Sequence, residues 1–283
     1  MWDFSGDEFL FFWAAAAVAL VGTVRAGLML IRTAPLRSNA RPKLALAVVV
    51  AACLAGLWVV LRNWADPASV AGHFDFELLF IFGGIAWLLL AMRFGFPLMG
   101  LSVRDDAIER QNLAATVAAC GGVIGVMLAY AQSNIGGGPT IWTTLVPALV
   151  ATVALFAVWA FAEFVGGGIS ENVTIDRDVA SGVRLAALLV SAGAVLGRAM
   201  AGDWTGWPDT FVDFARLGWP ALALAAIVAV VHRVCRPTPR RPRPGVFAFG
   251  VVPSAVLLAA TGLYFLALGA PHVAPAPTVA GTP

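Results

Sequence analysis

The feature that most constrains this chain is a succession of long apolar stretches separated by short polar segments. A membrane-spanning helix needs about 20 apolar residues to cross roughly 30 Å of hydrocarbon. In that layer the backbone must satisfy its own hydrogen bonds, and a helix does so within one segment. The sequence therefore predicts an all-α polytopic membrane protein with eight transmembrane helices. We expect these helices at about 9–32, 43–62, 76–99, 112–131, 141–165, 179–201, 211–234 and 246–269.

Composition supports this class, because 60% of the 283 residues are hydrophobic and only 12% are charged, whereas charged residues make up roughly a quarter of a soluble domain. Acidic residues (Asp3, Asp7 and Glu8) precede the first stretch, where a cleavable signal peptide would carry basic ones. We therefore expect a retained first helix. The three cysteines have no paired spacing and are interpreted as small apolar residues. They are Cys53, Cys120 and Cys235.

Basic residues collect in alternate loops. One set of loops contains Arg32, Arg37, Arg41, Lys43, Arg104, Arg110, Arg177, Arg233, Arg236, Arg240, Arg241 and Arg243. The loops of the other set contain only Arg62. Since short cytoplasmic loops are rich in Lys and Arg, we expect a bacterial inner-membrane protein with both termini on the outer side. The last basic loop, which contributes Arg233, Arg236, Arg240, Arg241 and Arg243, is interpreted as a topology signal, with anionic lipid binding as the alternative.

The middle of the chain contains a candidate repeat. The pair of helices at 76–99 and 112–131 resembles the pair at 141–165 and 179–201, and both pairs run in the same direction, so the repeat would be parallel. The two halves can be aligned in two ways, whose offsets differ by one residue. One alignment places Ile108–Arg110 on Ile175–Arg177, and the other places residues 112–117 on residues 178–183. The predicted organisation is a two-helix hairpin at 1–75, tandem two-helix repeats at 76–204, a second hairpin at 205–270 and a disordered tail at 271–283.

The repeat region resembles two tandem copies of the domain of unknown function 350, which occurs in small bacterial inner-membrane proteins. The shared motif is an acidic or amide turn followed by a helix rich in alanine and glycine. The resemblance implies a helical membrane architecture and no established activity. The matching residues are Glu109, Asn112, Ala114, Ala115, Gly121 and Gly125 in the first copy, and Asp176, Asp178, Ala180, Gly182, Gly193 and Gly197 in the second.

Two pairs of glycines lie four residues apart and so share a helix face: Gly121 with Gly125, and Gly193 with Gly197. Small residues let helix backbones approach closely in lipid, where dispersion contacts drive association. We expect these faces to pack against neighbouring helices of the same chain. A homo-oligomer interface is the alternative.

A polar stripe runs along the helix at 179–201. Arg177, Arg184, Ser191 and Arg198 recur every seven residues, which returns a side chain to within roughly 20° of its starting direction. An arginine at the centre of an isolated membrane helix costs at least about 2.5 kcal/mol. Arg184 is therefore expected to face the protein interior and to have a partner, whereas Arg177 and Arg198 are close enough to the helix ends to reach headgroups.

Height along the helices suggests two polar clusters. The inner polar cluster would contain Arg93, Glu163 and Arg184, with Glu163 as the expected partner of Arg184. The outer polar cluster would contain Arg198, Asp213 and Arg216. Such clusters either fix helix register or bracket a path for an anion or a proton. The structural interpretation is preferred.

The sequence lacks several constellations on which other membrane proteins depend. His73 and His272 are in external segments and His232 is at a helix end, so haem-ligating pairs are not expected. The single lysine, Lys43, is beside a loop, and no nucleotide-binding or hydrolase motif occurs. We predict no cofactor, no metal, no enzymatic activity and no nucleic-acid partner. The predicted function is a non-catalytic membrane subunit or anchor of a larger assembly, and the alternative is a small-ion or metabolite transporter.

Overall fold

The computed structural model describes residues 4–32, 40–237, 245–271 and 273. It confirms an all-α polytopic membrane protein, because eight helical segments in the described ranges are long and apolar enough to cross a membrane. The described residues form no β-strand beyond one isolated bridge between Ala65 and Gly136. The elements in chain order are α1 (Gly6–Arg32), α2 (Arg41–Asn63), α3 (Phe74–Leu90), η1 (Ala91–Gly95), α4 (Phe96–Leu98), η2 (Val103–Glu109), α5 (Leu113–Gln132), α6 (Trp142–Gly166), α7 (Ile169–Thr174), α8 (Val179–Arg198), α9 (Trp207–Gly218), α10 (Pro220–Cys235), η3 (Phe247–Val251) and α11 (Val252–Leu268).

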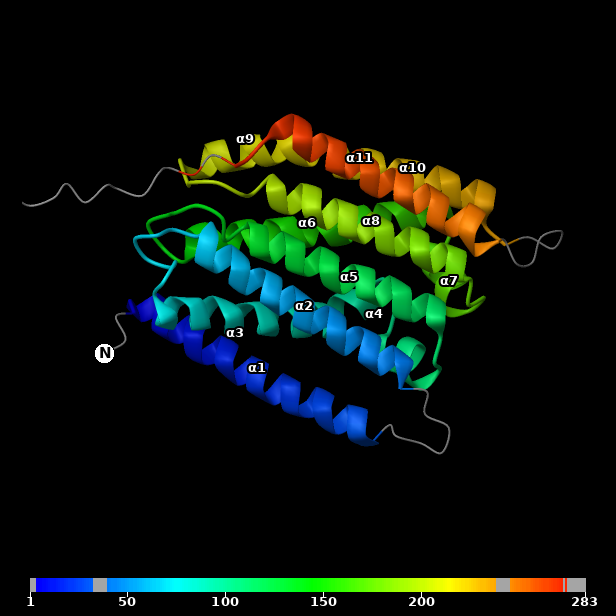
Figure 1. Ribbon diagram of the computed structural model, residues 1–283, viewed down its shortest axis with the longest axis horizontal. Coiled ribbons are helices and arrows are strands. Elements are labelled where there is room, and N and C mark those ends of the chain that lie inside the picture. The colour runs from blue at the N-terminus through cyan, green and yellow to red at the C-terminus, as the bar shows by residue number, and fades with distance from the viewer. Residues whose placement is uncertain (1–3, 33–39, 238–244, 272, 274–283) are drawn as a thin grey trace, which may run out of the picture.

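The spans lie side by side as a slab, and α1 and α11 start and finish at the same end of it (Figure 1). We call this end the termini end, and the end formed by η2 and α7 the turn end. In the order of packing, α2 contacts α5, α5 contacts α8, and α8 contacts α11. In addition, α1 packs on α3, and α10 packs on α6. The pair α5 and α8 is therefore the centre of the fold.

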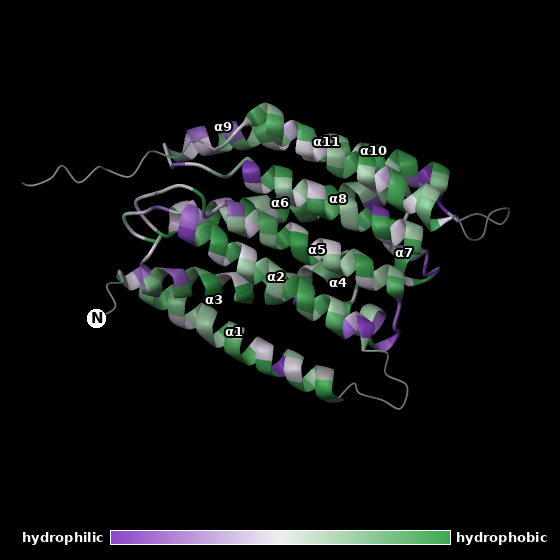
Figure 2. Cartoon of the chain, viewed as in Figure 1, coloured by the Kyte–Doolittle hydropathy of each residue, from purple (hydrophilic) through white to green (hydrophobic). Residues whose placement is uncertain are grey.

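Hydrophobic residues make up most of the outer helices, whereas hydrophilic residues gather near helix ends and in turns (Figure 2). Only 17% of the most apolar window of α1, α2 and α11 is buried, compared with 72% for α5 and 78% for α8. Since exposed apolar surface of this extent is unfavourable in water, the outer helices are suited to a lipid bilayer. The two central helices are shielded by their neighbours.

The glycines predicted to pack internally lie between α5 and α8. A Cβ atom added at Gly121 would lie 2.3 Å from the Cα of Ala186, and one at Gly125 would lie 2.3 Å from the carbonyl oxygen of Leu189. On the facing helix, a Cβ at Gly193 would lie 2.2 Å from the carbonyl oxygen of Gly125. The two backbones are thus in direct contact, which confirms the prediction that these glycines pack within the chain. Gly197 makes the same type of contact, at 2.6 Å from the carbonyl oxygen of Leu128.

The helices α5 and α8 also begin in the same way, 66 positions apart. Gln111 and Arg177 have left-handed φ angles of 51° and 53°. The next residue of each segment caps the helix: the side chain of Asn112 accepts from the backbone N–H groups of residues 114 and 115, and that of Asp178 accepts from those of residues 180 and 181. These matches coincide with the second of the two sequence overlays, which places residue 112 on residue 178.

Two five-residue π-helical turns, η1 and η3, each end two residues before a proline, Pro97 or Pro253. A proline ring clashes with the carbonyl four residues earlier and offers it no N–H donor. A π turn widens the helix at that point and accommodates the ring. The helix therefore continues through Pro253 as α11, whereas after Pro97 it ends at Leu98.

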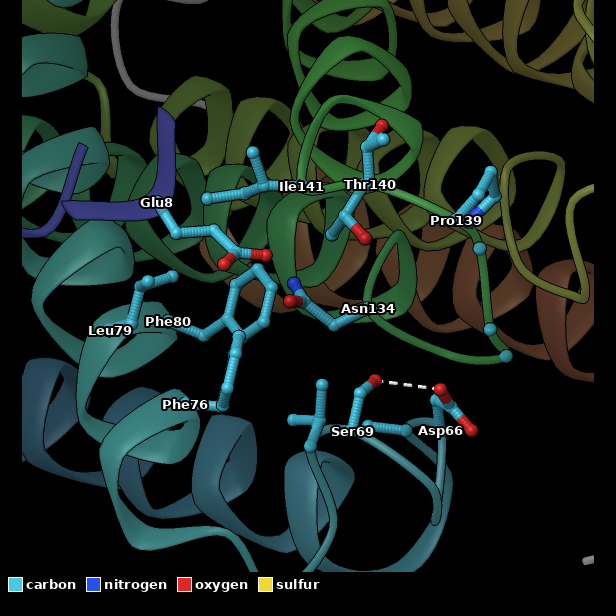
Figure 3. A pocket seen from close by; sticks show the side chains of 16 residues that line it. Glu8, Asp66, Ser69, Phe76, Leu79, Phe80, Asn134, Pro139, Thr140 and Ile141 are labelled. Carbon is cyan, nitrogen blue, oxygen red and sulfur yellow. Dashed lines mark hydrogen bonds between the residues drawn. The ribbon is translucent and has the colours of Figure 1, made fainter. Parts of the chain in front are cut away.

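The loops at the termini end are tied to one another. The N–H of Gly136 donates to the carbonyl of Trp64 at 2.9 Å, and the N–H of Gly202 donates to the carbonyl of Ile135 at 2.9 Å. The loops after α2 and α5, together with the start of α1 and the first turns of α3, line a cavity of about 110 Å³ (Figure 3). The loop geometry thus creates a small polar chamber at one end of an otherwise apolar slab.

Candidate functional site

Arg184 is the most unusual residue of the interior, because it is 1% exposed in the second turn of the membrane-spanning helix α8. Its Nη2 donates to the Ser181 hydroxyl at 2.9 Å and lies 3.3 Å from Nδ1 of His232. Nη2 also lies 3.9 Å from a carboxylate oxygen of Asp178, a long ion pair. Nη1 donates to the backbone carbonyl of Phe249. The prediction that Arg184 faces the interior and has partners is confirmed.

The Phe249 carbonyl is an acceptor for a structural reason. In a regular helix it would receive the N–H of residue 253, but that residue is Pro253. The π turn η3 lies at this position and packs against α8. Arg184 therefore binds a carbonyl that lacks its regular helical donor, and the contact joins α8 to the start of α11.

His232 extends the same network to a third helix. It belongs to the last turn of α10 and is fully buried. Arginine has only donors, so its contact with Nδ1 of His232 is a hydrogen bond when the neutral ring carries its proton on Nε2. On the other side of the ring, Nε2 lies 3.0 Å from the side-chain nitrogen Nδ2 of Asn172. The Arg184 network, defined as Arg184, Asp178, Ser181, His232, Asn172 and the Phe249 carbonyl, joins α7, α8, α10 and η3.

The expected pairing of Arg184 with Glu163 is wrong. The Glu163 carboxylate accepts instead from the backbone N–H of Ser170 at 2.9 and 3.0 Å, from the Ser170 hydroxyl, and from Nε1 of Trp159 at 3.0 Å. Gly167 and Gly168 have left-handed φ angles of 80° and 84°, which reverse the chain after α6. Glu163 thus caps the first turn of α7, where a negative charge is favourable.

The other members of the predicted clusters do not come together. Arg93 is exposed on η1, so it does not join Arg184 in an inner polar cluster. Arg198 is half-buried and donates to the carbonyl of Gly269 at 3.2 Å, while Asp213 and Arg216 are exposed on α9. The outer polar cluster is therefore also wrong. The residues of the arginine stripe also differ in their surroundings, because Arg177 is exposed and Ser191 is fully buried.

Of the residues predicted as an alternative anionic-lipid site, Arg233 and Arg236 are exposed at the end of α10. Arg233 also donates through Nε to the carbonyl of Val165 at 2.5 Å. Arg240, Arg241 and Arg243 lie outside the described residues, as does almost all of the predicted disordered tail.

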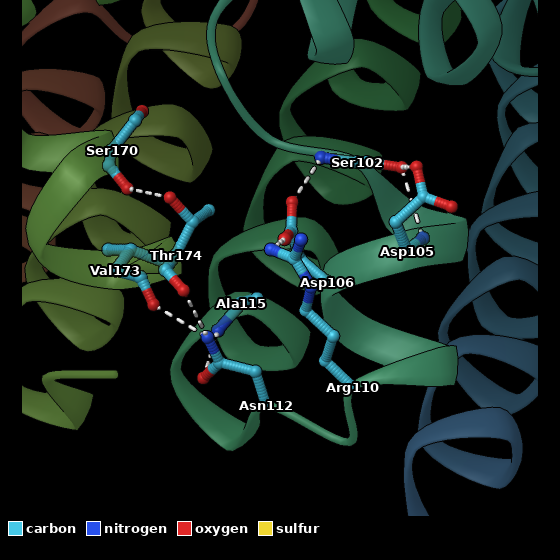
Figure 4. A network of polar contacts seen from close by, with 9 residues as sticks. All are labelled: Ser102, Asp105, Asp106, Arg110, Asn112, Ala115, Ser170, Val173 and Thr174. Carbon is cyan, nitrogen blue, oxygen red and sulfur yellow. Dashed lines mark hydrogen bonds and ion pairs between the residues drawn. The ribbon is translucent and has the colours of Figure 1, made fainter. Parts of the chain in front are cut away.

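A second polar network holds the turn end together (Figure 4). Asn112 donates through its Nδ2 to the carbonyl of Val173 at 2.8 Å, so the cap of α5 is bonded to α7. In the preceding turn, Asp106 accepts from the N–H of Ser102 at 2.8 Å and from Arg110 at 2.9 Å. Here polar side chains close turns and connect the start of α5 to α7.

One charged pair of this end is exposed to solvent. Arg104 lies 2.8 Å from Glu109, and the hydrogen bond to that carboxylate raises the pKa of the Arg104 guanidinium. Arginine is protonated at neutral pH in any case, so this pair does not create a pH-sensitive group.

Three features of the interior were not predicted from the sequence: His232 as a partner of Arg184, Asn172 as its support, and the chamber at the termini end. Pro253 was a usable signal, because a proline within a span leaves a carbonyl without its helical donor. Two further hydroxyls, those of Ser191 and Ser254, are buried without a hydrogen-bond partner. Comparison of the chain with family models, curated proteins and solved structures gives no match.

Proposed function

We propose that this chain is a non-catalytic integral membrane subunit of a larger assembly, and that its interior polar residues hold helices together. The observation that supports this best is the Arg184 network, whose side-chain contacts join four elements of the same chain. Glu163, the acid that the competing proton path would use, is likewise engaged as a cap of α7.

The packing of α5 against α8 supports the same proposal. At Gly121, Gly125 and Gly193 the two backbones approach so closely that even a methyl group would clash. A route for a solute between these helices would require the centre of the fold to separate. Transport along the polar face of α8 is the competing function, and the unpartnered buried atoms Arg184 Nε and Ser191 Oγ are what favour it.

We also propose that the protein resides in a bacterial inner membrane with both termini outside, and that it is built from parallel two-helix units like those of the family it resembles. The described arginines of the turn end support the orientation, since the side chains of Arg104 and Arg110 are 63% and 59% exposed. The matched helix starts at residues 111–112 and 177–178 support the repeat.

The experiment is to extract the full chain from native membrane in mild detergent and determine the mass and composition of the complex. We expect a partner in fixed stoichiometry, retained in the Glu163→Gln variant. A different outcome would contradict the proposal: the chain is recovered without a partner, it moves protons or chloride after reconstitution, and the Glu163→Gln variant does not. Glu171→Gln is the matched control, because Glu171 is a nearby acid that is exposed on α7.

A further inference from the structure

The chamber at the termini end is lined by two acids without a basic residue among the described side chains around it. Glu8 enters from the first turn of α1, and Asp66 enters from the loop after α2 (Figure 3). Opposite charge is thus missing from the lining. The chamber is a locally negative environment that favours a cation.

Asn134 adds a buried acceptor with no partner. It is 4% exposed and lines the chamber, and its Nδ2 donates to the carbonyl of Tyr130 at 2.8 Å. Because that bond needs the nitrogen, the amide cannot be turned over without bringing two oxygens together. The oxygen Oδ1 therefore stays where it is, and it has no hydrogen-bond partner. A buried, unsatisfied acceptor is costly, so this oxygen points to a missing donor.

The two carboxylates are oriented by their own turns and keep accepting capacity. Asp66 accepts from the N–H of Ala68 at 2.9 Å and from the hydroxyl of Ser69 at 2.6 Å. Glu8 accepts from the N–H of Ser5 at 2.7 Å. An ionised carboxylate offers about four acceptor positions, so each acid can accept further hydrogen bonds. A ligand for this chamber should bring several donors and positive charge.

One wall of the lining is apolar and includes Phe76, Leu79, Phe80 and Val70. A bare metal ion does not use such a wall, and Ca²⁺ needs six to eight oxygen ligands. Among the described residues there is no group of three or more His, Cys, Asp or Glu side chains that could hold a metal. A cation with a short hydrocarbon portion matches both halves of the lining.

We propose that this chamber binds a small primary alkylammonium ion. The ammonium has three donors, which suit the Glu8 carboxylate and the Oδ1 of Asn134, while Asp66 adds negative charge to the same lining. The alkyl portion lies against the wall that contains Phe76 and Phe80. The positive charge is also attracted to the face of an aromatic ring that lies near it. This inference is independent of the proposed subunit role, because the chamber lies at the termini end and does not use the Arg184 network.

The test is isothermal titration of the purified full chain in detergent with propylammonium chloride. We expect saturable binding, no saturable binding of 1-propanol, and at least about tenfold weaker binding of tetramethylammonium, which has a charge but no N–H donor. Glu8→Gln and Asp66→Asn should each weaken propylammonium binding about tenfold or more. Asp213→Asn is the control, because Asp213 is an exposed acid on α9 that does not line the chamber, and it should leave the affinity unchanged.

Three results would overturn the proposal: no saturable binding of propylammonium, equal affinity for tetramethylammonium, or displacement of propylammonium by a lower concentration of calcium chloride. The comparison of the two ammonium ions uses the unaltered protein, so it remains decisive even where a variant does not fold. For variants that fold, binding as tight as that of the unaltered chain in both Glu8→Gln and Asp66→Asn would also refute the assignment.

Discussion

Gly193→Ala tests whether backbone contact between α5 and α8 holds the centre of the fold together. The new methyl carbon would lie 2.2 Å from the carbonyl oxygen of Gly125 and 2.5 Å from its Cα. Ordinary contact begins at 3.4 Å, so the helices must separate locally by about 1 Å. A gap of 0.5–1 Å forfeits about a quarter to a half of each dispersion contact across it. Overpacking of this type costs about 1–3 kcal/mol. Because the clash is with backbone atoms, which cannot turn aside, we expect a cost in the upper part of that range, more than the helix-propensity gain of about 1 kcal/mol.

The matched control is Gly262→Ala, which makes the same change within α11 at a position where an added Cβ meets no atom within 4 Å. Both variants would be unfolded by denaturing detergent titrated into mild detergent, with helical circular dichroism as the signal. We expect Gly193→Ala to unfold at a lower denaturant fraction than the unaltered chain, and Gly262→Ala to unfold at the same fraction or a higher one. Equal midpoints for the two variants would refute the close-packing argument. Loss of self-association with unchanged monomer stability would instead favour an interface between copies.

Three further changes probe other parts of the structure. Arg184→Met should lower the free energy of unfolding by about 3–5 kcal/mol, since it leaves buried partners unpaired. This loss should add to that of Glu163→Gln within about 0.5 kcal/mol, because the two residues have separate partners. A coupling energy above about 1 kcal/mol between the two substitutions would show that Arg184 and Glu163 interact after all. Asn112→Ala should lower stability by about 0.5–2 kcal/mol through loss of the α5 cap, and an unchanged unfolding midpoint would show that the cap is dispensable. In intact spheroplasts, a membrane-impermeant thiol reagent should label Thr205→Cys and not Glu109→Cys in a background without native cysteines, whereas the reverse pattern would invert the topology.

The helices were predictable because the membrane imposes a length and a polarity that short sequence windows record. The internal packing of Gly121, Gly125, Gly193 and Gly197 was predictable for a related reason, since spacing by four fixes a common face. Burial of Arg184 followed from the cost of exposing it to lipid. Each of these inferences uses only residues on one helix.

The partner of Arg184 was not predictable in the same way. Height along adjacent helices placed Glu163 near it, but height does not determine which way a side chain points around the helix axis. The chain reversal at Gly167 and Gly168 brings α7 over Glu163 and supplies Ser170 as its donor. His232 comes from a helix 48 positions away, and only the packing of α10 on α8 brings it to Arg184.

The chamber at the termini end depends on contacts between loops, for which the sequence contains no periodic signal. Asn134 follows α5 and resembles an ordinary helix-end amide, and nothing in its neighbourhood pairs it with Glu8 or Asp66. The ties from Gly136 to Trp64 and from the following loop to residues 202–204 determine the arrangement. Tertiary closure of the loops therefore creates this site, whereas the Arg184 network is anchored by features that the sequence does contain.

The most direct test of the proposal that the polar interior is structural is ion flux in proteoliposomes that contain only this chain, with internal dyes for pH and chloride. The proposal predicts proton and chloride flux equal to that of protein-free vesicles, in the unaltered chain and in Glu163→Gln. Flux above that background, abolished by Glu163→Gln and retained by Glu171→Gln, would contradict it and establish a transport path through the interior.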